Sequence, residues 1–202
     1  DSENYLIERA KFYYHQKEFK NAERDYNLLV DLNKSFESYN ERGLFYGLIG
    51  KYEKAHKDFE KSITIDTSST AVYYYRHKIY EKQDLIVKQT ADLLKTIIMD
   101  PKDPEGYYYL AIIYEKQERY YKVISNYENA LRCLEASDRY FISDDNGDVI
   151  PHFKIYIKVA ETFKKLNESE DMCKFYKKAL NAADSFIEEK KSIEKLIKEN
   201  CK

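Results

Sequence analysis

The histidines and cysteines are the residues best suited to catalysis or metal binding, and their spacing indicates neither. Both types are scattered along the chain: His15, His56, His77, His152, Cys133, Cys173 and Cys201. No two of them stand at the short spacing that a zinc site needs. We therefore predict no metal site, and we expect the cysteines to be small buried thiols or tail thiols.

A polar stretch late in the chain has part of the pattern of a calcium-binding loop. Asp144, Asn146 and Asp148 match its first ligand positions, but Val149 stands where glycine is required and Ile155 where the last glutamate belongs. The Asn-Gly pair that begins at Asn146 lies between two apolar runs, which predicts a hairpin turn. We interpret this stretch as a polar turn.

Motifs of the common enzyme classes are absent from the sequence. It has no glycine-rich phosphate loop, no Gly-x-Ser-x-Gly nucleophile motif and no His-Glu-x-x-His zinc motif. We therefore expect that the protein is not an enzyme and needs no cofactor.

Net charge and hydrophobicity argue against two further classes of function, nucleic-acid binding and membrane association. The formal net charge of −2 argues against nucleic-acid binding driven by bulk charge. No apolar run approaches the roughly 20 residues of a membrane span, so no membrane partner is expected. No signal peptide is visible, which slightly favours the cytoplasm, but the chain begins at Asp1 and its localisation stays undetermined.

The residue types favour helices and contact surfaces. With 5 glycines and 3 prolines, the chain has few residues that interrupt helices. Its 21 tyrosines are unusual, because a tyrosine packs its ring and still needs a partner for its hydroxyl. Tyrosine therefore suits half-buried surfaces and interfaces.

The strongest pattern in the sequence is self-similarity. The tyrosine run 73–75 recurs at 107–109, and the Tyr-Glu-Lys-Gln run 80–83 recurs at 114–117, both at an offset of 34 residues. Extending this register gives five copies. A mostly small residue marks the first half of each copy: Ala10, Gly43, His77, Ala111 and Ala160. The second half begins with Ala22, Ala55, Gln89, Val123 and Met172, and four positions later come Tyr26, Phe59, Leu93, Tyr127 and Tyr176.

This pattern resembles the tetratricopeptide repeat family, in which small and aromatic residues alternate on two helices. Asp100-Pro101 also matches the closing Asp-Pro of that family's repeat. The resemblance implies an all-α fold, a right-handed α-α superhelix of about five helix-turn-helix repeats with a C-terminal capping helix.

The register also predicts the organisation of residues 1–202 as a single domain. The expected repeats are 3–35, 36–69, 70–103, 104–137 and 153–186. A loop or hairpin insertion is expected at 138–152, and a capping helix at 185–202 has an apolar stripe among Lys and Glu.

In this family the first helices line a concave groove, which usually binds an extended peptide or a helix. The register predicts which residues face it, and we take these as candidate ligand-binding residues: Lys11, Tyr14, Asn40, Tyr74, Tyr75, Lys78, Tyr108, Tyr109, Ile112 and Lys158. The tyrosine pairs would anchor a ligand, unless some of their rings only pack between neighbouring helices. Repeat two is acidic and repeat five basic on this face, which suits a ligand whose acidic end lies toward repeat five.

These patterns predict a non-enzymatic scaffold that binds a peptide or protein segment in its groove. One alternative is a structural module of a larger chain or complex, packing through its convex face or ends. Another is a binder of a small molecule or glycan at the tyrosine-lined groove. The ends of such arrays can pair, which leaves a homodimer open, and the identity of the protein partner is not specified by the sequence.

Overall fold

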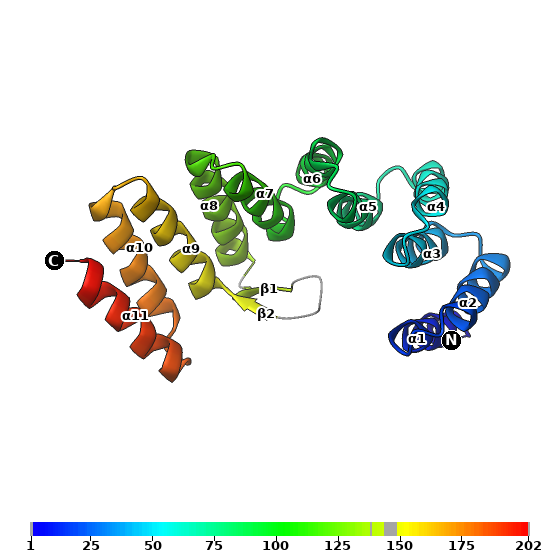
Figure 1. Ribbon diagram of the computed structural model, residues 1–202, viewed down its shortest axis with the longest axis horizontal. Helices are drawn as coiled ribbons and strands as arrows, with labels where there is room; N and C mark the ends of the chain where they lie inside the picture. The colour runs from blue at the N-terminus through cyan, green and yellow to red at the C-terminus, as the bar shows by residue number, and fades with distance from the viewer. Residues whose placement is uncertain (1, 138, 144–148, 202) are drawn as a thin grey trace. The chain divides into compact units, whose positions relative to one another are not determined.

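The computed structural model describes residues 2–137, 139–143 and 149–201, and this part of the chain is helical apart from one pair of short strands (Figure 1). The helices are α1 (Ser2–His15), α2 (Phe19–Leu32), α3 (Phe36–Leu48), α4 (Tyr52–Ile65), α5 (Ala71–Lys82), α6 (Ile86–Met99), α7 (Pro104–Lys116), α8 (Tyr120–Ala136), α9 (His152–Lys165), α10 (Ser169–Ala182) and α11 (Ile187–Asn200). The strands are β1 (Phe141–Ser143) and β2 (Val149–Pro151). The expected all-α class is therefore confirmed.

The helices form two compact units. Unit 1, Asp1–Met99, contains the pairs α1–α2, α3–α4 and α5–α6. Unit 2, Asp100–Lys202, contains the pairs α7–α8 and α9–α10, the two strands and α11. Each pair is a helix–turn–helix in which the two members pack against each other.

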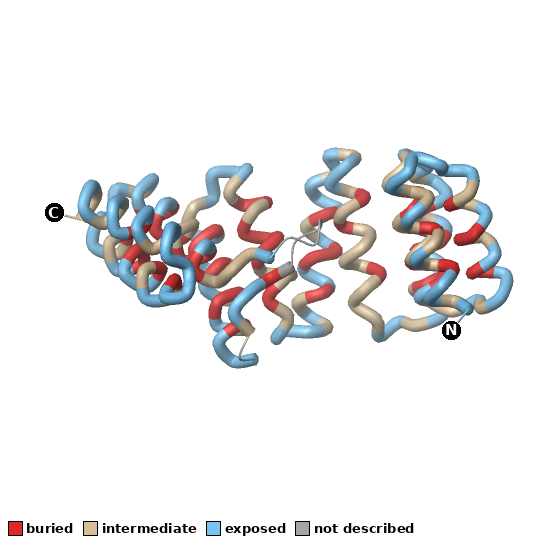
Figure 2. Tube along the Cα trace, turned by 90° about the horizontal axis from the view of Figure 1, so that it is seen from below, coloured by how far each residue is buried: buried red, intermediate tan, exposed pale blue. Residues whose placement is uncertain are grey.

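The positions that recur in the sequence form the cores of these pairs. All five of the recurring first-helix positions are buried, from Ala10 to Ala160, including His77, and so are the ten recurring second-helix positions, from Ala22 to Tyr176. In Figure 2 the buried segments recur along the helices where neighbours meet. Small side chains let the two backbones approach, and the aromatic rings fill the space beside them.

The turn inside each pair has the same backbone conformation in all five repeats. Lys17, Gly50, Asp84, Glu118 and Asn167 have a positive φ of 55–79° and occupy equivalent positions. The amide of the next residue then donates back to a first-helix carbonyl, as from Lys51 to Tyr46 at 2.8 Å and from Leu85 to Tyr80 at 2.9 Å. This bond pattern is that of a Schellman-type helix end. Four of the five positions accept the left-handed conformation without glycine.

Gly47 of α3 packs directly against Ile79 of α5. A Cβ atom at this position would lie 2.4 Å from Cδ1 of Ile79, a fully buried side chain. Glycine is therefore required for this packing, and Gly47 serves the core rather than a ligand surface.

Unit 2 has two features besides its helix pairs, a strand pair between α8 and α9 and the last helix, α11. Strands β1 and β2 pair antiparallel, with Ile142 opposite Ile150. The Asn-Gly pair expected to form their turn lies outside the described residues. Helix α11 packs on α10, and a disulfide joins Cys173 of α10 to Cys201 at the end of α11, with 5.6 Å between their Cα atoms. The expectation of unlinked thiols is thus wrong for these two cysteines, whereas Cys133 is free and half-buried.

Candidate functional site

The candidate residues of unit 1 lie on its first helices, α1, α3 and α5. Nζ of Lys11 is 3.8 Å from Oε1 of Glu8 on the same helix and 3.7 Å from Oε2 of Glu41 on α3. The Glu41 side chain is 15% exposed. Burial raises its pKa, and the nearby Lys11 ammonium only partly opposes this effect. The structure thus places a partly desolvated carboxylate on this face.

Tyrosines surround that carboxylate. Burial raises the pKa of Tyr75, and the charge of Glu41 raises it further. Burial also raises the pKa of Tyr26, a second-helix residue, and the negative charges of Glu41 and Glu8 raise it further. We call Glu8, Lys11, Glu41, Tyr26 and Tyr75 the Glu41 cluster. It combines phenol rings with two carboxylates and one ammonium.

Asn40 precedes Glu41 on α3 and is 1% exposed. Neither atom of its side-chain amide has a hydrogen-bond partner among the residues that the structure describes. Burying an amide without partners costs roughly 1–3 kcal/mol, so this position is unfavourable for the isolated fold.

The other candidates of unit 1 make ring contacts. The Tyr14 ring packs against Phe19 and Phe45, with centroids 5.9 and 6.4 Å away. The Tyr74 ring lies 6.3 Å from that of Tyr75, and Nζ of Lys78 lies 4.4 Å from the Tyr74 centroid. Lys78 thus contacts the aromatic pair through a cation–π interaction.

In unit 2 the second tyrosine pair is enclosed. Tyr108 and Tyr109 are 5% and 8% exposed, with their rings 5.5 Å apart in a T-shaped arrangement. The Tyr108 ring also lies 5.7 Å from that of Tyr127. Ile112 is half-buried. Large changes of these rings would therefore alter packing as well as any contact with a ligand.

Lys158 belongs to a small charged group on the first helices of unit 2. Its Nζ lies 3.8 Å from Oε2 of Glu115, and Nζ of Lys165 lies 3.3 Å from Oε1 of the same residue. Lys158 also lies 5.9 Å from the Tyr127 centroid. Two lysines share one carboxylate here, and Lys164 nearby is exposed, so this face of α9 is basic.

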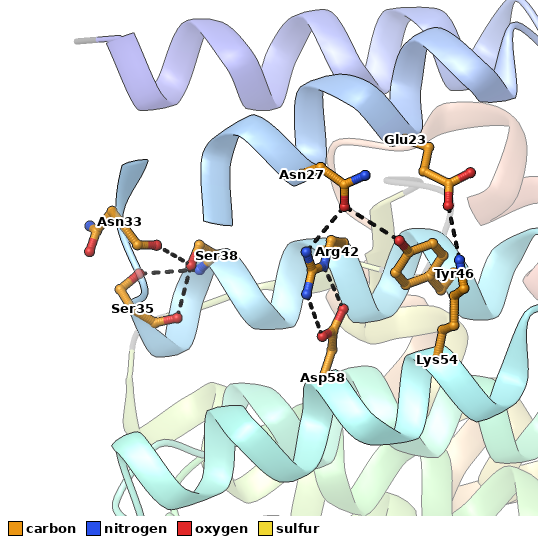
Figure 3. A network of polar contacts seen from close by, with 9 residues as sticks. All are labelled: Glu23, Asn27, Asn33, Ser35, Ser38, Arg42, Tyr46, Lys54 and Asp58. Carbon is orange, nitrogen blue, oxygen red and sulfur yellow. Dashed lines mark hydrogen bonds and ion pairs between the residues drawn. The ribbon is translucent and has the colours of Figure 1, made fainter. Parts of the chain in front are cut away.

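Sequence reasoning missed a set of ion pairs in which partly exposed arginines bind buried aspartates. Arg9, Arg42 and Arg76, each on a first helix, bind an aspartate 16 residues later on the second helix: Asp25, Asp58 and Asp92. In the middle pair both oxygens of Asp58 accept bonds of 2.8 Å from Arg42 (Figure 3). Aligning charged residues in the repeat register would have revealed the set, because both residue types recur at offsets of 33 and 34.

The middle pair is part of a wider network between α2, α3 and α4. Nη1 of Arg42 donates to Oδ1 of Asn27 at 3.1 Å, and the Tyr46 hydroxyl donates to the same oxygen at 3.4 Å. Glu23 of α2 accepts from Lys51 at 2.7 Å. It also accepts from Lys54 at 3.2 Å (Figure 3). The network joins consecutive helix pairs.

No group of three or more His, Cys, Asp or Glu in the described part of the chain could hold a metal ion. Among the same residues, no helix has the length and apolar character required to span a bilayer.

Comparison with known proteins agrees with this architecture. Family models described as tetratricopeptide repeat match residues 36–69, 93–124 and 153–186. A curated relative, human RNA polymerase II-associated protein 3, is 32% identical over 94 residues. That match covers 41% of this chain and 14% of the relative, so it spans a small part of the longer protein.

Solved structures show the same fold over nearly the whole chain. A crystal structure of MamA superposes with a TM-score of 0.66 and 18% identity, covering 93% of this chain and 94% of that one. PilF of Pseudomonas aeruginosa superposes with a TM-score of 0.64 and 12% identity, covering 98% of this chain and 91% of that one. YrrB is described as a TPR protein with an unusual peptide-binding site. It superposes with a TM-score of 0.57 and 15% identity, covering 90% of this chain and 87% of that one. With matched family models and five helix pairs in one register, the chain belongs to the tetratricopeptide repeat family.

Proposed function

We propose that the protein is a non-enzymatic scaffold whose first-helix face binds a segment of a partner protein. Tetratricopeptide repeat proteins are in general protein-interaction scaffolds, which supports the class of function. The Glu41 cluster supports the location, since binding sites combine aromatic surface with a few placed polar groups, and a partly desolvated carboxylate gains from an added hydrogen-bond donor.

The single observation that carries the proposal is the environment of two adjacent residues, Glu41 and Asn40. One is a partly desolvated carboxylate with a lysine 3.7 Å away, and the other is a buried amide without a described partner. Both reduce the stability of the isolated fold. Glu41 keeps 15% of its side chain exposed, so a hydrogen-bond donor of a partner that reaches this carboxylate would offset its share of that cost on binding.

The basic face of α9 supports a polarity for the bound segment. Lys158 and Lys165 share Glu115, and Lys164 adds an exposed ammonium, so an acidic stretch would bind there more favourably than a basic one.

A second candidate function is that of a module within a larger assembly. The observation in its favour is that the matched relative is much longer, with 14% of its length aligned. In that case the ends or second-helix surfaces of the array would contact neighbouring domains.

The test is affinity capture from the native cell extract with three near-isosteric changes in the Glu41 cluster, Lys11→Gln, Glu41→Gln and Tyr75→Phe. We expect a partner retained by the wild type to be lost, because the changes remove charge and a hydroxyl without opening a cavity. The control variant changes Glu53→Gln and Lys57→Gln on the exposed side of α4. Identical partner lists for all three proteins, with equal helical circular dichroism, would exclude this face as the site.

A further inference from the structure

Helix α6 carries an exposed apolar stripe on the side opposite its core. The stripe consists of Val87, Ala91, Leu94 and Ile98, and we call it the α6 stripe. Val87 is 84% exposed, Leu94 43% and Ile98 73%, and Ala91 is also exposed. The opposite side of α6 is already occupied, because Gln89, Leu93 and Thr96 are buried. The fold of unit 1 therefore does not need the stripe for its own core.

The other repeats show that this apolar character is specific to α6. In repeat two the four equivalent positions hold Glu53, Lys57, Glu60 and Thr64. In repeats one, four and five every equivalent position is polar or charged except Tyr121. On α6 all four of these positions are apolar, although in the other repeats they are polar apart from Tyr121. Such an exposed apolar set is typical of an interaction surface.

The spacing of the stripe fits one partner helix. Its residues follow one another at steps of four, three and four, the pattern of a coiled-coil seam. They extend over about three turns, or about 16 Å. Such a narrow seam suits knobs-into-holes packing against a single helix, whereas a helix that lies on a membrane presents a wider apolar face.

The residues along the two margins of the stripe determine which charges the partner helix must carry. Lys88 and Lys95 are exposed along one margin, seven residues apart, and Nζ of Lys88 lies 5.6 Å from the Tyr80 centroid. The other margin carries Thr90 and Ile97. If a second copy docked antiparallel, the lysine margins of the two copies would face each other. If it docked parallel, the lysine margin of each copy would face Thr90 and Ile97 of the other. Neither arrangement neutralises the lysines.

We propose that the α6 stripe is the docking site for an amphipathic helix of a partner protein, with acidic residues beside its apolar seam. Leucine or isoleucine side chains of the partner interleave with Val87, Leu94 and Ile98. Its carboxylates lie against Lys88 and Lys95, which sets the orientation of the partner and disfavours basic helices. This surface lies outside the first-helix face and does not depend on the function proposed above.

The probe is a designed peptide of about 21 residues, three heptads with leucine and isoleucine at the seam and glutamate at both margins. A matched peptide has lysine in place of every glutamate. We expect the glutamate peptide to bind the wild type roughly tenfold or more tightly than the lysine peptide in fluorescence anisotropy at low salt.

Two variants complete the test. One transfers the surface of repeat two onto α6, as Val87→Glu, Ala91→Lys, Leu94→Glu and Ile98→Thr, and should lower the affinity roughly tenfold or more with unchanged circular dichroism. The other, Lys88→Glu with Lys95→Glu, should reverse the preference between the two peptides.

Several results would overturn the proposal. Equal binding of the two peptides, or no effect of the transferred surface, would remove the acidic helix as the occupant. A wild-type dimer in sedimentation equilibrium that the transferred surface abolishes would assign the stripe to a second copy. Sedimentation with phosphatidylserine vesicles that is lost in the same variant would assign it to a lipid surface.

Discussion

At the scale of single residues, the arginine–aspartate pairs distinguish the first three repeats from the last two. The guanidiniums of Arg9, Arg42 and Arg76 bridge the two helices of their repeats, and each also lies over a tyrosine ring of its own helix. In repeats four and five, Leu110 and Val159 take the arginine position. An apolar side chain thus replaces the arginine in the last two repeats, and only the first three repeats can lose one member of an ion pair.

The Arg42–Asp58 pair can be tested by single and double substitution. We expect Arg42→Leu to lower the free energy of unfolding by about 2–3 kcal/mol, because it leaves a buried carboxylate unpaired. The double variant Arg42→Leu with Asp58→Leu should cost less than that single change, since no charge is left without a partner. Urea denaturation measures all three proteins, and strictly additive losses would show that the two side chains do not interact.

Asp103 predicts a pH dependence of stability. It caps α7 by accepting from the Glu105 amide, and burial, followed by its contact with Glu105, raises its pKa to about 7. Although burial opposes it, contacts with Asp103 and Arg139 hold the pKa of Glu105 below its ordinary value. The proton therefore resides mainly on Asp103.

Because the folded protein binds a proton at Asp103 that the unfolded chain releases near pH 4, this stabilisation is present at low pH and lost as pH rises to about 7. We expect Asp103→Asn, which keeps a capping oxygen, to flatten the decline of unfolding free energy over this interval. Chemical denaturation at several pH values measures the difference between the two proteins. Parallel profiles would show that Asp103 is ionised throughout.

At the scale of elements, α11 depends on its covalent link as much as on its packing. Ile193 is buried, Leu196 and Ile197 are half-buried, and Ile187 is exposed. Phe186 stands at the N-cap position of the helix and makes no side-chain cap bond, although its ring lies 4.9 Å from that of Phe153. A short helix with one buried side chain is marginal without further restraint.

The disulfide supplies that restraint and makes α11 sensitive to reduction. A link between residues separated by 28 positions contributes roughly 3 kcal/mol. We expect dithiothreitol, or Cys201→Ser, to accelerate amide hydrogen exchange in α11 strongly and in α10 much less. Cys133→Ser is the matched control, since that thiol is free. Equal exchange in α11 before and after reduction would show that packing alone holds the helix.

At the scale of the whole molecule, the repeat register distributes charge and apolar surface unevenly among similar units. The Glu41 cluster lies mainly on the first helices of unit 1, with Tyr26 from α2. Lys158, Lys164 and Lys165, the lysine group, lie on a first helix of unit 2, and the α6 stripe lies on a second helix. Similar helix pairs therefore present different chemistry, which is how a repeat array acquires several contact surfaces.

The lysine group predicts a charge effect on binding. Reversal at Lys158→Glu and Lys164→Glu should weaken the complex with a captured partner roughly tenfold at low salt, and less at high salt, because the bound segment is expected to be acidic there. The control is Lys174→Glu with Lys177→Glu on α10, which changes the net charge equally at exposed second-helix positions. An unchanged affinity for the first variant, measured by calorimetry, would exclude this polarity.

The sequence by itself determined the helix pairs, their register and the residues of their cores. These depend on side-chain size and periodicity, so Ala10 and Ala22 or Ala111 and Val123 could be matched from their spacing alone. The tertiary structure decided which residues meet across that register. It paired Arg42 with Asp58 and Cys173 with Cys201, enclosed Tyr108 and Tyr109, and left Val87 and Ile98 uncovered. Periodicity specifies the face on which a side chain lies, whereas its burial and its partners depend on which neighbouring helix covers that face.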